Sequence, residues 1–233
     1  MVAVQNPLIP FDHTYILYSP DNIFSLPLAA ASLTPILILV FLFSWFVITR
    51  EIEPCIFAAG HVCNDILSGI LKNTVRYPRP IRGQIFKQDG GLVWGMPSSH
   101  TQFMSFWFTY TLLAYILNYP GRSISKKCQL IYSIGAMFTV GMVIASRIVF
   151  EYHNWNQVIV GLLLGSVLAC FYWVFVNLLR EYGIIDRLLS GKIFKLLLVK
   201  DSFGRGSFPL LEDERRVYEE IVSVKGDSAA RRN

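Results

Sequence analysis

Four long stretches without a charged residue constrain this chain more than any other feature of its sequence. They run from residue 22 to 49, from 101 to 121, from 128 to 146 and from 154 to 179. A helix that spans a bilayer needs about 20 consecutive apolar residues, so each stretch is long enough to cross. Only 16% of the 233 residues are charged and 53% are hydrophobic, which is too apolar for an ordinary soluble domain. The sequence therefore predicts an all-α fold, a polytopic bundle of transmembrane helices.

A fifth apolar segment, residues 54–71, contains His61, Asn64 and Asp65, so hydropathy alone does not decide whether it spans. A charged Asp at the centre of a membrane helix costs about 2.5 to 3.5 kcal/mol. We therefore expect Asp65 to face other helices and to pair with His61, one turn earlier. Five spans follow, with four to six possible, near residues 28–49, 54–71, 101–119, 128–146 and 157–179.

The region after the fifth span has a different pattern. Residues 184–199 mix apolar with basic side chains and are too short and too charged to cross, so we expect an amphipathic helix in the membrane interface. The membrane-embedded domain would then cover residues 1–200, and residues 201–233 would form a tail. Within the fifth span, Gly161 and Gly165 have the spacing that lets helices approach closely. We expect them to pack in the core, with dimerisation as the alternative.

The distribution of Lys and Arg predicts which parts of the chain face the cytoplasm, because basic residues beside spans tend to remain there. The connection 121–128 holds three of the 21 basic residues, and the region from Arg180 to the end holds 11. Both regions are expected to be cytoplasmic. Five spans then place the segment 72–100 and the turn 147–153 together on the opposite face, which is lumenal or exterior. The five basic residues of segment 72–100 are either solvated or anchor an anionic headgroup, and we favour the headgroup.

Polar clusters stand where the apolar stretches end on this predicted face. In the segment KNTVRYPRP, Lys72 lies at a helix end, and Arg79 stands between two prolines that restrict its backbone. The planar fork of an arginine can bind two phosphoryl oxygens at once. The next cluster, PSSH at residues 97–100, leads into the third span, where the N–H groups of a helix start can bind an anion. There Ser98 and Ser99 can cap the helix or donate to a phosphate.

A third cluster combines Arg147, His153 and Gln157, with Gln157 one helical turn beyond the histidine. Phosphoryl transfer requires mainly positioning and charge stabilisation, together with a nucleophile and a proton source. His100 and His153 supply the last two, and Lys72, Arg79 and Arg147 supply the charge. Each residue also has a plain structural explanation by itself, such as an arginine that anchors a helix at the interface. Their order, spacing and common face favour a phosphate site.

The series K-x6-RP, PSxH and SR-x5-H, within residues 72–157, resembles the signature of the type 2 phosphatidic acid phosphatase superfamily of membrane phosphatases. The segments IPFDHTYILY and YHNWNQVIVG are similar to its dolichyl diphosphate phosphatase branch, in a fungal member. The resemblance implies that His153 attacks phosphorus to give a phosphohistidine and that His100 protonates the leaving oxygen. It also implies that no metal or other cofactor takes part, and that phosphate is bound by Lys72, Arg79, Arg147, Ser98 and Ser99.

Two positions depart from the family pattern. Ser99 stands where the family usually has glycine, so a hydroxyl is expected to replace part of a backbone contact with phosphate. Gln157 stands where many members have an aspartate that orients the nucleophilic histidine and stabilises its charge. A Gln carbonyl can fix the ring but brings no charge, so the nucleophile is expected to be weaker. A diphosphate, which has a good leaving group, is therefore favoured over a phosphate monoester.

The leading hypothesis is hydrolysis of dolichyl diphosphate to the monophosphate and phosphate at the lumenal face of the endoplasmic reticulum membrane. This reaction would recycle the lipid carrier of protein N-glycosylation. Among enzymes, the alternative is a phosphatase for phosphatidic acid or sphingoid phosphates. From a different class, the alternative is a non-catalytic membrane protein that binds lipid headgroups. The expected partners are the polyprenyl substrate and membrane lipids, with no nucleic acid, and the sequence leaves the oligomeric state open.

Overall fold

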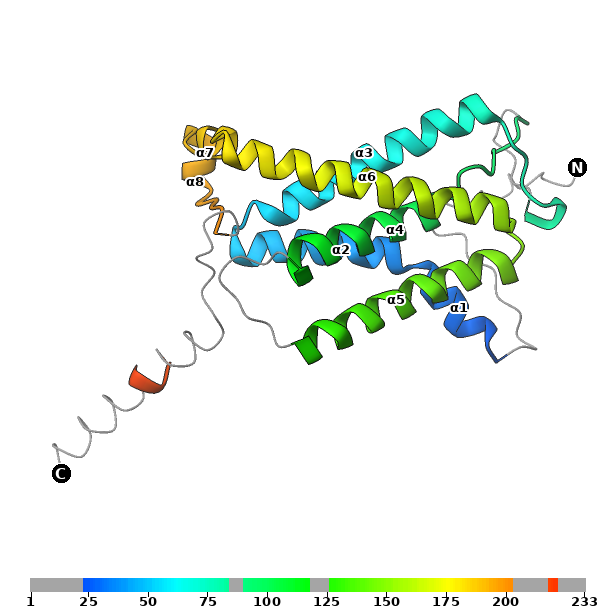
Figure 1. Cartoon of the computed structure of the whole chain (residues 1–233), viewed down its shortest axis with the longest axis horizontal. Helices are drawn as coiled ribbons and strands as arrows, with labels where there is room; N and C mark the ends of the chain where they lie inside the picture. The colour runs from blue at the N-terminus through cyan, green and yellow to red at the C-terminus, as the bar shows by residue number, and fades with distance from the viewer. Residues whose placement is uncertain (1–22, 84–89, 118–125, 203–217, 222–233) are drawn as a thin grey trace, which may run out of the picture.

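The computed structural model describes residues 23–83, 90–117, 126–202 and 218–221, and the predicted all-α fold is confirmed. Its long helices lie side by side in a bundle (Figure 1). They are α1 Ser25–Ser32, α2 Thr34–Thr49, α3 Glu53–Val75, α4 Ser99–Thr111, α5 Lys126–Val149 and α6 Trp155–Glu181. The shorter elements are a 3-10 turn at Ile81–Gly83, a π-helical turn at Leu112–Leu117, and the helices α7 Ile184–Leu189 and α8 Lys192–Leu196.

Three described helices, α3, α5 and α6, are each long and apolar enough to cross a membrane. A fourth candidate is the pair α1 and α2, which is bent by 45°. The predicted third span corresponds to α4 and the π-helical turn after it, and its last residues, 118–119, lie outside the described residues. The five-span arrangement stays a prediction.

The two ends of the bundle differ in what they hold. One end, on the right in Figure 1, holds the end of α3, the start of α4 and the turn between α5 and α6. We call it the motif end, because the three polar clusters of the sequence lie there. The opposite end, called the tail end, holds the turn between α2 and α3 together with α7 and α8.

The bend between α1 and α2 follows from the sequence at the break. Pro35 has no N–H group, and its ring crowds the carbonyl of Ala31, four residues earlier. The Thr34 hydroxyl donates to this carbonyl at 2.7 Å, so the carbonyl keeps a hydrogen-bond partner. Because the helix axis turns here, α1 packs against α5 near the motif end, whereas α2 packs mainly against α3 (Figure 1).

The helix α4 lies in the middle of the bundle and packs most extensively against α6. Gly165 makes this close contact possible, because a Cβ atom on it would lie 2.2 Å from the carbonyl oxygen of Gln102. A Cβ atom on Gly161 would lie 2.9 Å from the carbonyl oxygen of Ser98. The expected core packing of both glycines is confirmed. The buried core around α4 comprises Ile38, Leu42, Phe57, Met104, Phe106, Tyr110, Ala114, Val140, Val143 and Ala169.

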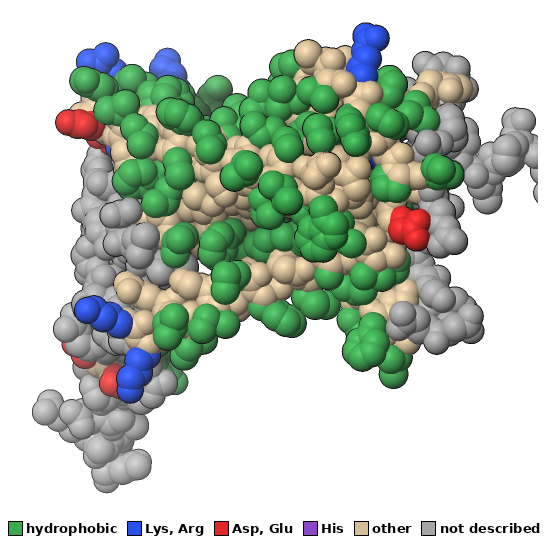
Figure 2. All heavy atoms as spheres, turned by 45° about the vertical axis from the view of Figure 1, so that its right-hand side comes forward, with side chains coloured by type: hydrophobic (Ala, Val, Ile, Leu, Met, Phe, Trp, Pro, Cys, Tyr) green, Lys and Arg blue, Asp and Glu red, His purple; other side chains and the backbone are tan. Residues whose placement is uncertain are grey.

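The outer surface of the bundle is apolar between its two ends. Hydrophobic side chains are spread over the described face in Figure 2, with backbone and other side chains between them, and Lys and Arg side chains lie near its edges. Phe41 on α2, Phe138 on α5 and Phe171 on α6 are each more than 60% exposed. So many exposed apolar side chains are stable when lipid tails cover them, as around a membrane-spanning bundle.

Asp65 does not face the other helices, and the predicted pair with His61 is wrong. The Asp65 side chain is exposed on α3. His61 is only 2% exposed and stacks between Phe57 and Phe103, with ring centroids 5.1 and 3.8 Å away. A residue four positions further along a helix is rotated by about 40°, which carries Asp65 past the edge of the contact between α3 and α4.

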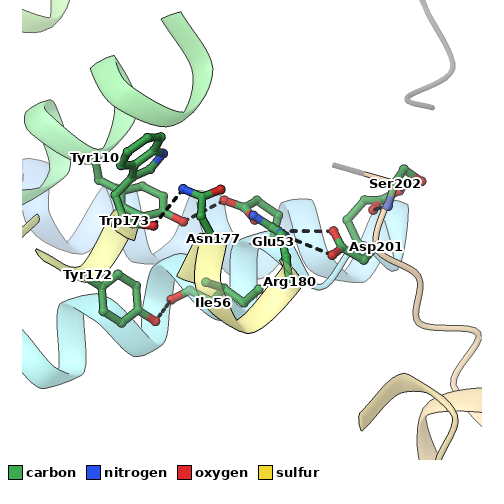
Figure 3. A network of polar contacts seen from close by, with 10 residues as sticks. Glu53, Ile56, Tyr110, Tyr172, Trp173, Asn177, Arg180, Asp201 and Ser202 are labelled. Carbon is green, nitrogen blue, oxygen red and sulfur yellow. Dashed lines mark hydrogen bonds and ion pairs between the residues drawn. The ribbon is translucent and has the colours of Figure 1, made fainter. Parts of the chain in front are cut away.

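A network of ion pairs and hydrogen bonds connects α3, α4, α6 and Asp201 at the tail end (Figure 3). Arg180, near the end of α6, forms an ion pair with Glu53 at the start of α3. The Nε atom of Arg180 also lies 3.1 Å from a carboxylate oxygen of Asp201. Tyr110 donates a further hydrogen bond to Glu53 at 3.0 Å. Glu53 is fully buried, so no water reaches its carboxylate. The hydrogen bonds and charges of these partners stabilise the carboxylate instead.

The chain after α8 returns to the turn between α2 and α3. The Lys200 N–H donates to the Arg50 carbonyl at 3.0 Å, and the Ile52 N–H donates to the Lys200 carbonyl at 2.9 Å. The N–H and hydroxyl of Ser202 donate to the Glu51 carboxylate at 3.0 and 2.8 Å. These bonds tie residues 200–202 to the tail end. The segment 184–199, expected as one interfacial helix, contains the two short helices α7 and α8.

Candidate active site

The motif end brings the three polar clusters into contact. The side-chain amide of Gln157 donates to the backbone carbonyl of Pro78 at 2.7 Å. The N–H of Ser98 donates to the backbone carbonyl of Gln157 at 3.2 Å. Lys72 donates to the hydroxyl of Ser99. Each bond joins two different clusters, so residues far apart in the sequence form one site at the adjoining ends of α3, α4 and α6.

Two serines hold Lys72 at this site. Its ammonium group donates to the Ser99 hydroxyl, and the Ser99 hydroxyl lies 3.0 Å from that of Ser68. Ser68 is 2% exposed and lies one helical turn before Lys72 on α3. Ser68 was not among the residues predicted from the sequence, although its position four residues before Lys72 places both on one helix face. The two hydroxyls therefore fix the direction in which the Lys72 side chain extends.

The start of α4 carries Ser98, Ser99 and His100. Ser98 takes the N-cap position with extended backbone angles, but its side chain makes no capping hydrogen bond. Its hydroxyl is buried and accepts from Thr101 at 3.0 Å. His100 is the second residue of α4 and is half-buried. A helix start concentrates N–H groups and partial positive charge, which favours a bound phosphate beside Ser99 and His100.

Arg79 packs closely against the polypeptide around it. A Cβ atom on Gly95 would lie 2.8 Å from Cγ of Arg79 and 2.6 Å from Nε2 of Gln157. The Gly95 N–H donates to the carbonyl of Tyr77 at 2.8 Å, which ties this glycine to the segment before Arg79. Only a residue without a side chain fits between Arg79 and Gln157. Gly95 is thus a further site residue that the sequence analysis missed, because one glycine in a loop carries no spacing signal.

Arg147 is 6% exposed at the end of α5 and has three neighbours around its guanidinium group. Nε donates to the Ser146 hydroxyl at 3.2 Å, and a terminal nitrogen donates to the Ser32 hydroxyl on α1. The Tyr152 ring lies beneath the group, with its centroid 4.7 Å from Cζ. A buried guanidinium group held on these sides presents its remaining N–H groups in a fixed direction.

His153 is 4% exposed in the turn between α5 and α6, and its N–H donates to the Arg147 carbonyl at 3.2 Å. Its Nδ1 atom lies 3.0 Å from Oε1 of Gln157. The Gln157 amide nitrogen must face the Pro78 carbonyl, because a carbonyl can only accept. Oε1 is therefore the atom that faces His153. The histidine carries its proton on Nδ1, and Nε2 keeps a free lone pair.

The electrostatic surroundings keep His153 neutral. Burial, followed by the nearby charge of Arg79, lowers the pKa of His153 well below its usual 6.5, and Lys72 and Arg147 lower it further. The hydrogen bond to Gln157 raises this pKa but does not outweigh the other causes. Three cations therefore surround a neutral imidazole, which is the arrangement expected for a nucleophile that attacks an anion.

The family model for the PAP2 superfamily matches residues 53–181. The chain belongs to the PAP2 superfamily. The matched segment runs from the first residue of α3 to the last residue of α6, so this PAP2 region contains all three clusters. The helices α1 and α2 lie outside it, and the Ser32 hydroxyl that contacts Arg147 comes from this additional part of the chain.

Full-length relatives narrow the resemblance within the PAP2 superfamily. Dolichyldiphosphatase of Saccharomyces cerevisiae is 39% identical over 227 residues, which are 94% of this chain and 93% of the yeast protein. Human Dolichyldiphosphatase 1 is 26% identical over 197 residues, 83% of this chain and 82% of the human protein. The Putative dolichyldiphosphatase of Neurospora crassa is 24% identical and covers 94% of this chain. No solved structure gives a significant match. The resemblance inferred from the motifs is confirmed.

The two departures from the usual PAP2 pattern have distinct surroundings. The Ser99 hydroxyl, which replaces a glycine, contacts Lys72 and Ser68. Gln157, which replaces an aspartate, uses both ends of its amide, one for His153 and one for Pro78. A carboxylate could serve the histidine but could not donate to Pro78. In the part of the chain that the structure describes, no three His, Cys, Asp or Glu residues are grouped as metal ligands.

Proposed function

We propose that this protein hydrolyses dolichyl diphosphate to dolichyl monophosphate and inorganic phosphate. The observation that carries the proposal is the neutral, buried His153, whose Nδ1 proton is held by Gln157 and which has Arg79, Lys72 and Arg147 around it. The yeast and human relatives named dolichyldiphosphatase support the choice of substrate. The activity is that of a hydrolase acting on a phosphorus-containing anhydride.

The proposed mechanism has two steps and uses two histidines. Nε2 of His153 attacks the terminal phosphorus and forms a P–N bond, while the bond from this phosphorus to the bridging oxygen breaks. Dolichyl monophosphate leaves with the electron pair, and His100 donates a proton to its oxygen. Water then attacks the phosphohistidine and gives a proton to His100, the P–N bond breaks, and inorganic phosphate leaves. Both histidines return to their starting states.

Fixed cations would supply the charge stabilisation that a metal ion provides in other phosphoryl-transfer enzymes. Lys72, Arg79 and Arg147 converge on His153 closely enough to lower its pKa, and a transferring phosphoryl group would lie against the same histidine. The N–H groups at the start of α4 add partial positive charge. On this basis we propose a metal-independent reaction.

Gln157 supports a diphosphate as the substrate. A neutral amide does not stabilise an imidazolium ion as a carboxylate would, so His153 gains less driving force for the attack. A phosphate monoester leaving from a diphosphate is a much better leaving group than an alkoxide leaving from a monophosphate. The weaker nucleophile is therefore adequate for dolichyl diphosphate and poorly suited to phosphatidic acid or a sphingoid phosphate.

The proposed location is the membrane of the endoplasmic reticulum, with the motif end facing the lumen and the tail in the cytoplasm. The concentration of basic residues after Arg180 supports this orientation, because such residues favour the cytoplasmic side. In this location the reaction would recycle the lipid carrier that protein N-glycosylation releases as a diphosphate.

The test compares phosphate release by the purified protein from dolichyl diphosphate, phosphatidic acid and a sphingoid phosphate, with EDTA present throughout. We expect release from the diphosphate in EDTA and its loss in His153→Asn, which replaces the imidazole by a smaller polar amide that cannot attack phosphorus. Asn156→Ala, an exposed neighbour on α6, serves as the control and should retain activity. A preference for phosphatidic acid would favour the alternative substrate class, and activity that survives His153→Asn would refute the mechanism.

A further inference from the structure

The Ser32 hydroxyl links the first membrane segment to the active site. Ser32 is the last residue of α1 and is 3% exposed. A terminal nitrogen of the Arg147 guanidinium group donates to its hydroxyl oxygen, and the hydroxyl proton is donated to the Leu28 carbonyl at 3.1 Å. Since a guanidinium group has no acceptor, these roles cannot be exchanged. Ser32 thus accepts a hydrogen bond from Arg147, while its own hydroxyl proton is donated to the Leu28 carbonyl.

The bend of the first span is what brings Ser32 to this position. Pro35 turns the helix axis immediately after Ser32, and α1 packs against α5 as a result. Figure 1 shows α1 beside the motif end of α5, whereas α2 continues towards the tail end. A straight helix would continue along the direction of α2 and take Ser32 away from α5. The break in the span therefore has a consequence for the active site.

From these contacts we propose that Ser32 is a positioning residue that holds the Arg147 guanidinium group in the direction needed to bind the substrate phosphate. The proposal rests on the proposed function in one respect, since it takes Arg147 as a ligand of the transferred phosphoryl group. Ser32 belongs to α1, outside the segment that the PAP2 family model matches.

The position of Arg147 depends on Ser32 because the other supports leave one motion open. Ser146 contacts Nε, close to the pivot of the group, and the Tyr152 ring contacts its flat face. The ring does not resist rotation of the group within its own plane, and the long bond at Nε, near the pivot, resists it only weakly. Ser32 contacts a terminal nitrogen and fixes that rotation. An arginine held in this way loses less side-chain freedom when it binds a phosphate, which favours binding.

The first experiment measures Ser32→Ala for two properties, namely kcat/KM and the affinity for orthovanadate, a phosphate mimic whose binding is followed by thermal shift. A hydrogen bond to a charged group has an energy that corresponds to a roughly ten- to hundredfold effect, so we expect both properties to fall by about tenfold or more. Ser44→Ala is the matched control, because the Ser44 hydroxyl also bonds a carbonyl four residues earlier but lies on the exposed face of α2. It should change neither property.

A double-mutant cycle separates positioning from a general effect on packing. In an Arg147→Lys background, the guanidinium group that Ser32 contacts is absent. Ser32→Ala should therefore have little further effect on orthovanadate affinity. Ser32→Thr retains the hydroxyl and should retain most of the affinity, which provides a second variant if Ser32→Ala lowers the yield of folded protein. Equal losses in both backgrounds, or an unchanged orthovanadate affinity in Ser32→Ala, would overturn the inference.

The outcomes distinguish this inference from the proposed function. If the wild-type protein binds orthovanadate in a Ser32-dependent manner but releases no phosphate from dolichyl diphosphate, the substrate assignment fails and the role of Ser32 stands. If dolichyl diphosphate is hydrolysed and Ser32→Ala matches the wild type in kcat/KM and in orthovanadate affinity, the inference alone fails.

Discussion

Gln157→Glu is the substitution that most directly tests how the site is assembled. The two side chains have nearly the same shape, so a carboxylate oxygen can still accept from Nδ1 of His153, now 3.0 Å from Oε1 of Gln157. The other oxygen would replace the amide nitrogen that donates to the Pro78 carbonyl at 2.7 Å. Two acceptors would then face each other at hydrogen-bond distance. The substitution therefore removes the contact with the Pro78 segment and leaves the contact with the nucleophile.

The size of the effect follows from the loss of that one bond. Leaving a partly buried carbonyl without its donor costs about 1 to 3 kcal/mol, and repulsion between the oxygens adds to the displacement of Pro78. Arg79 is the next residue in the chain, so the displacement moves a proposed phosphate ligand. Taken alone, this cost lowers kcat/KM by about five- to 150-fold, since about 1.36 kcal/mol corresponds to a factor of ten, and the charge that the carboxylate brings to His153 offsets part of the loss.

The assay is phosphate release from dolichyl diphosphate across a range of pH, for the wild type, Gln157→Glu and Gln157→Leu. The added carboxylate favours protonated His153 and raises its pKa, so the acid limb of the Gln157→Glu profile should move to higher pH. Gln157→Leu loses both hydrogen bonds and should be less active than Gln157→Glu on the pH plateau. Because the carboxylate also strengthens His153 as a nucleophile, the loss at Pro78 is measured separately, as the affinity of each variant for inorganic phosphate. If Gln157→Glu binds phosphate as tightly as the wild type, the Pro78 contact does not position Arg79 and the reasoning is refuted.

Three further predictions concern the nucleophile and the packing at each end of the bundle. Since burial and nearby cations lower the pKa of His153, kcat/KM of the wild type should not fall from protonation of His153 between neutral pH and about 6.5. Gly165→Ala should destabilise the protein by at least about 1 to 3 kcal/mol, because the new Cβ would meet a carbonyl oxygen at 2.2 Å. Arg180→Ala should lower the melting temperature in detergent strongly, because a fully buried Glu53 without its cation costs about 3 to 5 kcal/mol.

Each of these measurements has a control and a result that would count against it. An acid limb centred near 6.5 would show that the cations do not act on His153. Gly135→Ala on α5 places a Cβ in open space and should not destabilise, so equal melting of the two glycine variants would contradict close packing at Gly165. Arg187→Ala on α7 removes an exposed arginine near Arg180, and a loss of stability as large as that of Arg180→Ala would argue against the buried ion pair.

The candidate site was predictable where spacing within one segment carries the information. Lys72 and Arg79 share one short segment, and His153 and Gln157 are one helical turn apart, so their relation is readable from the sequence. Ser68 could have been found in the same way, since it lies one turn before Lys72 on α3. The contact of Ser32 with Arg147 joins residues 115 positions apart, and no local pattern indicates it.

The error at Asp65 has a similar cause. The expectation rested on the cost of a charge in a membrane helix, but the sequence does not specify which arc of α3 contacts α4. Phe103 stacks on His61, and α4 continues along α3 to Asn64 and Ser68, whereas Asp65 lies on the exposed arc of α3. The tail end shows the same limit, because residues 200–202 pair with the turn between α2 and α3 across about 150 positions of sequence, as in the Ser202 bond to Glu51.

The sequence by itself determined the membrane class, the helical fold and the residues of the candidate phosphate site. It could do so because the length of an apolar stretch and the spacing of residues along one helix are local properties. Only the tertiary structure decided how the segments meet: the turn of α1 at Pro35 onto α5, the fit of Gly165 against α4, and the double use of the Gln157 amide. These features depend on the directions in which neighbouring helices present their side chains, which packing determines and sequence spacing does not.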